Sequence, residues 1–170
     1  MKPLLILQDA DIFPEAERVE DFSAFKTRIA VKVAIFDGEG KIALVGTKNR
    51  LLPGGGVEGN ETLLQAVMRE CLEEVGCSVG HIKEIATTEE YRAETKRHQI
   101  THFFTATLLG ERGAPQTTQE DEQGIQVEWF AIPDAIALLE KQLKEIPFES
   151  YNSCFNVRTH LAFLRELTVR

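Results

Sequence analysis

A run of three glycines followed by an acidic, amphipathic segment occupies residues 53–77 of the chain. The glycines at 54–56 follow Pro53, whose ring fixes one backbone angle. Glycine permits tight turns and a close approach of backbone that residues with a Cβ resist. The sequence therefore predicts a tight loop directly before the acidic segment.

The acidic segment is predicted to be a helix from about Glu61 to Val75. Asn60 belongs to the residue types that cap helix N-termini, and Glu61 would lie in the first turn, where the helix dipole favours an acid. Gly76 is a typical C-terminal stop.

The predicted helix has two distinct faces. Glu70, Glu73 and Glu74 fall within one narrow sector at about 100° per residue. On a helix, like charges at this spacing repel each other by about a few tenths of a kcal/mol per pair. A divalent cation bound between them would remove that repulsion. All-oxygen ligands suit Mg²⁺ or Mn²⁺. The face expected to pack against the sheet carries Leu64, Val67, Met68, Cys71, Leu72 and Val75.

Glutamate-rich helix faces are usually solvated surface, so the three acids alone identify no site. The register of the neighbouring residues is more specific. Gly55 is followed after five residues by Glu61, and seven further residues lead to Arg69-Glu70, Glu73-Glu74 and Gly76. This spacing, from Gly55 to Cys77, resembles the Nudix box, the signature of the Nudix hydrolases. Cys71 and Cys77 replace the usual aliphatic residues, but cysteine packs as a small hydrophobe.

The resemblance implies hydrolysis of a nucleoside diphosphate linked to another group, such as a nucleotide, a nucleotide sugar or a modified nucleoside triphosphate. It implies metal ligation by Glu70, Glu73 and Glu74, with the carbonyl of Gly54 as a further candidate, and places Glu73 and Glu74 in catalysis. The metal would neutralise the diphosphate and activate a water for in-line attack. The implied structural residues of the box are Gly55, Glu61, Arg69 and Gly76.

The general base stays open between a box glutamate and a carboxylate from a distant loop. The polar stretch from Glu111 to Gln123 contains Glu120 and Glu122, which are the candidates outside the box, although such an acidic loop is more often simply solvated.

Four basic residues are candidates for contacts with the substrate phosphates. Arg28 and Lys32 lie on one face of a predicted strand, while Lys48 and Arg50 directly precede the glycines. The motifs that distinguish NADH-type, coenzyme A-type and many ADP-ribose enzymes are absent, so the sequence leaves the substrate open. The alternative function is a Nudix-like domain that senses a ligand or binds a protein without turnover; such domains commonly lose box carboxylates, and this chain retains them.

Residues 28–36 alternate as a strand does, with Ile29, Val31, Val33 and Ile35 on one side. Asp37 to Gly40 is predicted to be a hairpin turn. The other predicted strands are 42–45, 79–91, 99–109 and 124–132. Two helices are predicted after them. One begins at Pro133, and the other, near the C-terminus, is capped by Asn152.

This order matches the fold that the resemblance implies, an α/β (α+β mixed) α/β/α sandwich with a mixed β-sheet. We expect residues 1–27 to be an N-terminal extension packing on the domain, 28–145 the Nudix hydrolase domain, and 146–170 a C-terminal helix of the same domain.

Composition limits the partners. The 170 residues carry a formal charge of −8 with a pI near 5.1, which argues against a broad nucleic-acid surface. The N-terminal apolar run is too short for a signal peptide or membrane span. Three cysteines without metal-site spacing fit a reduced, cytoplasmic protein. A small-molecule nucleotide diphosphate is the expected partner, and the resemblance allows a homodimer.

Overall fold

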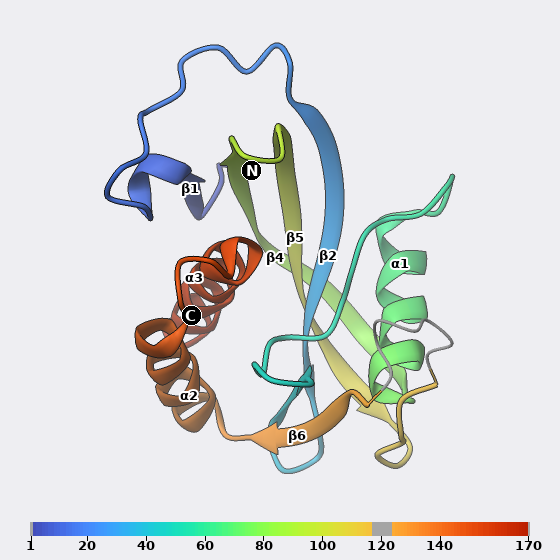
Figure 1. Cartoon of the computed structure of the whole chain (residues 1–170). Helices are drawn as coiled ribbons and strands as arrows, with labels where there is room; N and C mark the ends of the chain where they lie inside the picture. The colour runs from blue at the N-terminus through green and yellow to red at the C-terminus, as the bar shows by residue number, and fades with distance from the viewer. Residues whose placement is uncertain (1, 117–123, 170) are drawn as a thin grey trace.

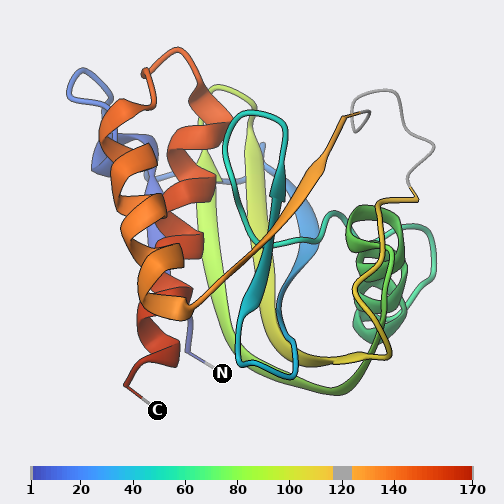
Figure 2. The same ribbon diagram turned by 90° about the horizontal axis from the view of Figure 1, so that it is seen from below.

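The structure, a computed structural model, describes residues 2–116 and 124–169. It is a three-layer arrangement in which a mixed sheet separates one helix from two others (Figures 1 and 2). The strands are β1 (Leu5–Gln8), β2 (Lys26–Phe36), β3 (Ile42–Gly46), β4 (Ser78–Arg92), β5 (Arg97–Leu109) and β6 (Gln126–Phe130). The helices are α1 (Leu63–Glu70), which continues into a π-helical turn (Cys71–Val75), α2 (Ile132–Glu145) and α3 (Tyr151–Leu167); a short 3₁₀ turn spans Asp9–Asp11.

The strands lie in the order β1-β4-β5-β2-β3-β6. The central strand β2 pairs in parallel with β5 and antiparallel with β3, and the predicted hairpin turn joins β2 to β3. In that turn the Asp37 N–H donates to the carbonyl of Lys41 (2.9 Å), and Gly40 N–H donates back to Asp37 (3.1 Å). The parallel pairing places β2 at the centre of the sheet, where it can carry site residues.

Both faces of β2 are covered in the second half of the strand. Val31, Val33 and Ile35 are buried in the cluster under α1, whereas Ala34 is buried in the cluster under α2 and α3. Burying apolar side chains on both faces is what holds three layers together. The predicted α/β/α sandwich is confirmed, and the basic residues of β2 lie on its α3 side.

The residues before position 28 supply the edge strand β1, which pairs in parallel with β4. Asp9, at the end of β1, accepts a hydrogen bond from the Tyr151 hydroxyl (2.8 Å) and another from the Ala93 N–H (2.9 Å). The N-terminal segment is thus held to both the sheet and α3.

The predicted helix 61–75 begins later and changes its geometry. The N-cap is Thr62, whose hydroxyl accepts from Gln65 N–H (3.3 Å) while the Gln65 side chain accepts from Thr62 N–H (2.8 Å). The expected cap at Asn60 is therefore wrong, because Glu61 turns toward Arg69 instead of entering the first turn. Gly76 ends the segment in the left-handed conformation (φ 70°), as predicted.

The cap predicted for the last helix is also wrong. The N-cap position is Ser150, and Asn152 lies inside α3. Its side-chain carbonyl instead accepts a hydrogen bond from Arg92 of β4 (2.6 Å), so a tertiary partner has taken the group that would have capped the helix.

The apolar face of the box helix is only half buried. Val67, Cys71 and Val75 are fully buried, but Leu64, Met68 and Leu72 remain 49%, 49% and 45% exposed. Each set of three is spaced i, i+4, i+8 and so forms its own row along the helix. Only the row of Val67, Cys71 and Val75 lies against the sheet.

No helix in the described parts of the chain is long and apolar enough to cross a membrane. The three cysteines are unpaired and buried.

His160 joins α3 to the loop that precedes the glycines. Its Nδ1 accepts a hydrogen bond from the Leu52 N–H (3.1 Å), and the ring is 2% exposed. Burial, together with the charges of Lys32 and Arg92, lowers the pKa of His160 well below its usual value. The histidine is therefore neutral in the folded protein.

We expect this histidine to make stability depend on pH. Its pKa is depressed on folding, so its contribution is present above the unfolded pKa of about 6.5 and is lost as pH falls. Between pH 7.5 and 5.5 the free energy of unfolding should fall by about 1.4 kcal/mol more in the wild type than in His160→Gln. Urea unfolding at both pH values measures this. The exposed His81→Gln should keep the wild-type pH dependence, and identical curves for all three proteins would refute the assignment.

Candidate active site

The glycine loop lies alongside β2 like an additional short strand. Val31 N–H donates to Gly55 O (2.9 Å), and Val33 N–H donates to Pro53 O (3.0 Å). Gly54 has φ 129°, and a Cβ there would collide with the Val31 carbonyl. The predicted tight loop therefore requires glycine for both conformation and space.

Arg69 connects the box helix to this loop. Its guanidinium donates to Glu61 (2.7 and 3.2 Å), to the carbonyl of Gly56 (2.9 Å), to Glu70 (2.8 Å) and to Glu73 (3.2 Å). These charge-assisted bonds raise the pKa of Arg69 and lower that of Glu61. Arg69 thus ties Glu61 and the box helix to the glycine loop.

Glu70 lies beneath the glycine loop. It is 5% exposed, and a Cβ on Gly55 would lie 3.0 Å from its Cδ. Burial and, to a smaller extent, the nearby Glu74 carboxylate raise the pKa of Glu70 to about 7, although Arg69 opposes this shift. Two carboxylates close enough to disturb one another are an arrangement that a cation would stabilise.

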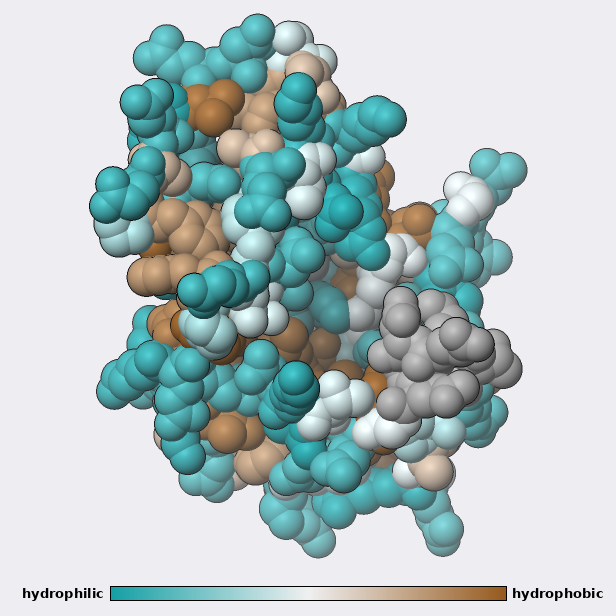
Figure 3. Space-filling view, viewed as in Figure 1, coloured by the Kyte–Doolittle hydropathy of each residue, from teal (hydrophilic) through white to brown (hydrophobic). Residues whose placement is uncertain are grey.

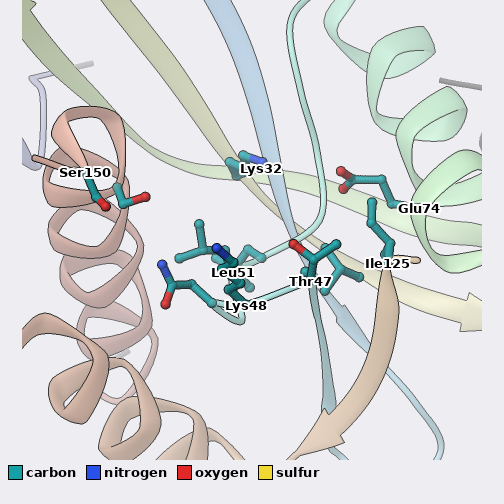
Figure 4. A pocket seen from close by; sticks show the side chains of 12 residues that line it. Lys32, Thr47, Lys48, Leu51, Glu74, Ile125 and Ser150 are labelled. Carbon is teal, nitrogen blue, oxygen red and sulfur yellow. The ribbon is translucent and has the colours of Figure 1, made fainter. Parts of the chain in front are cut away.

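Both backbone polar groups of Gly54 are held by side chains. Its N–H donates to Glu74 (2.6 Å), and its carbonyl accepts from the Lys32 ammonium group. Figure 4 shows Glu74 and Lys32 on opposite sides of the same pocket, with their charged ends directed into it. An acid from α1's continuation and a base from β2 therefore meet at the loop.

The donor set fits a hard divalent cation, because the carboxylates of Glu70, Glu73 and Glu74 lie on one helical segment beside the glycine loop, whose carbonyl oxygens are further hard donors. In the described residues, however, no three acidic, histidine or cysteine side chains are already grouped as a cation site. Glu70 and Glu73 are engaged by Arg69, and Glu74 is engaged by Gly54. Binding a cation would therefore require side-chain rotation, chiefly of Glu73.

The four basic candidates are placed differently. Lys48 and Lys32 line the pocket of Figure 4, which has a volume of about 390 Å³. Arg28 lines a second hollow on the α3 side of the sheet, and Lys32 and the glycines border that hollow too. The guanidinium of Arg50 is occupied by contacts within the protein. It donates hydrogen bonds to Glu128 (2.7 Å), Gln126 (2.6 Å) and the Gly46 carbonyl (2.7 Å).

Figure 3 shows that the face carrying these pockets is hollowed near its centre and mostly hydrophilic around the hollow. Glu120 and Glu122 lie outside the described residues. The chain just before them runs beside the box helix, because Gln116 N–H donates to the carbonyl of Glu73 (2.7 Å).

The sequence analysis missed several polar residues of the second hollow. Arg92 and Glu90 of β4 form a buried ion pair, and Arg92 also donates to Asn152 (2.6 Å) and Asn156 (2.7 Å) of α3. One signal was present in the sequence: Glu90 and Arg92 stand at alternate positions of the predicted strand 79–91 and its end, so they share one face.

Comparison with known proteins agrees with this geometry. The family profile described as the NUDIX domain matches residues 26–152, which is most of the chain. The chain belongs to the Nudix hydrolase family. The match contains the glycine loop, the box helix and the first two residues of α3, whereas most of α3 lies beyond it.

A solved structure supports the fold of this Nudix protein. It is similar to the MutT Nudix hydrolase of Burkholderia pseudomallei, with 25% identity, a TM-score of 0.53 and coverage of 64% of this chain and 85% of that one. A structure from a study of MutT from Aliivibrio salmonicida and Vibrio cholerae is 24% identical, with a TM-score of 0.49 and coverage of 66% and 85%. A comparison with curated proteins gave no match.

We expect Gly55→Ala to destabilise the metal-free protein. The new methyl group would press on the buried Glu70 carboxylate, and overpacking of this kind costs about 1–3 kcal/mol. The melting temperature in EDTA should fall by several degrees. Gly38→Ala is the matched control, because a Cβ there meets nothing within 4 Å. Equal melting temperatures for both variants would show that Glu70 does not lie against the loop.

Proposed function

We propose that this Nudix protein is a divalent-metal-dependent pyrophosphohydrolase that cleaves a nucleoside diphosphate linked to another group. The observation that carries the proposal is that Glu70 and Glu74 lie against the glycine loop, where Lys32 also contacts Gly54, with Glu73 held nearby by Arg69. Acids that can hold a cation and a base that can contact a phosphate then lie beside one backbone segment.

In this proposal the acids, Lys32 and Arg69 have separate roles. Glu70, Glu73 and Glu74 would hold the metal, which supplies charge neutralisation of the diphosphate and a more acidic bound water. Lys32 would release the Gly54 carbonyl and contact a phosphate oxygen. Arg69 keeps the loop and helix in register. Mg²⁺ is the proposed metal and Mn²⁺ the alternative, because both accept carboxylate oxygens and tolerate bound water and phosphate.

The general base remains a proposal with two candidates, a box glutamate or one of Glu120 and Glu122. The position of Gln116 beside Glu73 supports the distant candidates, since only a few residues separate it from Glu120. A homodimer is a further proposal, and the exposed apolar row Leu64, Met68 and Leu72 on the box helix supports it.

We expect Glu73→Gln and Glu74→Gln each to lower kcat at least about a hundredfold, because each removes a carboxylate from the proposed metal site. Release of phosphate products is measured across a panel of nucleoside diphosphate derivatives with Mg²⁺, Mn²⁺ or EDTA. Glu145→Gln is the control, because Glu145 lies on the outer surface of α2 in a weak i, i+4 pair with Lys141. The same proteins are melted with and without millimolar metal, and only the wild type and the control should be stabilised.

Two results would contradict this proposal. Full activity in both box variants would remove the acids from the reaction. Metal-dependent stabilisation without hydrolysis of any compound would instead favour the alternative function, a domain that senses a ligand or binds a protein.

We expect either Glu120→Gln or Glu122→Gln to lose kcat while keeping KM, if one of these residues is the general base. A true base should also shift the acidic limb of the pH–rate profile. Near-wild-type rates in both variants would assign the role to a box glutamate.

A further inference from the structure

The second hollow, on the α3 side of the sheet, has a volume of about 390 Å³ and a strongly polar lining. Strands β2, β4 and β5 form its floor, and the first half of α3 forms its wall (Figure 1). It opens onto Gly54 and Gly55, the loop that borders the proposed metal site. An occupant could therefore lie in the hollow and reach the metal site at the same time.

Three of the four cations that line this hollow have no ion-pair partner among the described residues. Arg92 is neutralised by Glu90, but Arg28, Lys32 and Arg97 form no ion pair within the described residues. Partial burial lowers the pKa of Arg28, and the charges of Arg97 and Arg92 lower it further. The more weakly acting Glu70 and Glu90 oppose this pKa shift without forming an ion pair with Arg28. Cations that repel one another within a chain of net charge −8 indicate an anionic occupant.

The position of Arg28 links this charge to the scissile region. Its guanidinium packs against the loop, since a Cβ on Gly56 would lie 2.7 Å from Nη2, and Nη1 donates to Gln99 (3.1 Å). Arg97 lies on the neighbouring strand β5, directly beside Lys26 of β2. The two arginines thus approach the hollow from adjacent strands.

The hollow offers hydrogen bonds but no stacking surface. None of its described lining residues is phenylalanine, tyrosine or tryptophan. The one ring, His160, is buried with its edge toward Phe103 (centroids 5.7 Å apart). Gln99 and Thr101 of β5 and Asn152 and Asn156 of α3 supply amides and a hydroxyl. A hydroxyl-rich group suits this lining better than a nucleobase, which is usually bound by stacking.

The wall is held in place before any ligand binds. Arg92 donates to Asn152 and Asn156, pairs with Glu90, and lies over the ring of Phe155 (4.9 Å to its centroid). Fixing these amides from beneath reduces the ordering that binding would otherwise require.

We propose that this hollow binds a phosphorylated sugar, so that the substrate carries a phosphate monoester on a sugar joined to the diphosphate that is cleaved. This deepens the proposed function and rests on it for the position of the diphosphate. Arg28 and Arg97 contact the monoester, and the amides contact the sugar hydroxyls. Hydrolysis adds water across the P–O–P link, with oxygen going to one phosphorus and a proton to the leaving phosphate, and the monoester is unchanged.

The first experiment measures binding without turnover. Ribose 5-phosphate and ribose are titrated into the metal-free protein in EDTA and followed by calorimetry. Ribose 5-phosphate should bind, and Arg97→Gln and Arg28→Gln should each weaken it at least tenfold. Arg165→Gln is the control, because it removes an exposed arginine near the other end of α3. No binding of ribose 5-phosphate, equal binding of ribose, or full binding by both hollow variants would overturn the proposal.

The second experiment tests the sugar-phosphate site separately from the hydrolase activity. With Mg²⁺, kcat/KM is measured for 5-phosphoribosyl 1-diphosphate and for ADP-ribose, which has a pentose on its diphosphate but no monoester. Arg97→Gln should lower the first at least tenfold and the second less than twofold. Equal losses would overturn the sugar-phosphate assignment while leaving the hydrolase intact. If no diphosphate is cleaved but ribose 5-phosphate binds as expected, the proposed function fails and the anion site stands.

Discussion

The arrangement of the site depends on the guanidinium group of Arg69. Glu70 is almost fully buried next to another carboxylate, and a buried charge without a partner would strongly destabilise the fold. Arg69 partners Glu70 and, with the same planar fork, holds Glu61 and the carbonyl of Gly56. A lysine could supply the charge but not this set of fixed directions. The loop and the box helix are therefore positioned by one side chain.

The same bonds explain why the acids are close together without forming a ready cation site. Arg69 neutralises Glu70 and Glu73 when no metal is bound, and the Gly54 N–H satisfies Glu74. In the proposed function a cation would compete with these partners, and a substrate phosphate would compete with the Gly54 carbonyl for Lys32. Each exchange would replace one charge-assisted bond by another.

The parts of the structure that were predictable from sequence are those fixed by short-range spacing. The alternation of residues 28–36 predicted a strand, and the glycine, glutamate and arginine register predicted the loop and helix. The caps at Asn60 and Asn152 were mispredicted for one reason. A side chain can cap a helix only if neither it nor its neighbour is bonded to a residue elsewhere in the fold. Here Arg69 binds Glu61, the neighbour of Asn60, and Arg92 binds Asn152 itself.

The hollow beside α3 could not be predicted from the sequence, because its lining residues come from distant parts of the chain. Arg92 and its partners Asn152 and Asn156 are separated by 60 and 64 residues, and neither the strand pattern of β4 nor the helical pattern of α3 relates them. Helix α3 also buries Phe163 and Leu164 in the core, so one face of it anchors the fold while its N-terminal half forms the wall of the hollow. Because those wall residues lie outside the box, substitutions in them should alter what the hollow accepts without disturbing the acids of the proposed metal site. In the function proposed above, catalysis and selectivity would be carried by elements on opposite faces of the sheet, joined at the glycine loop.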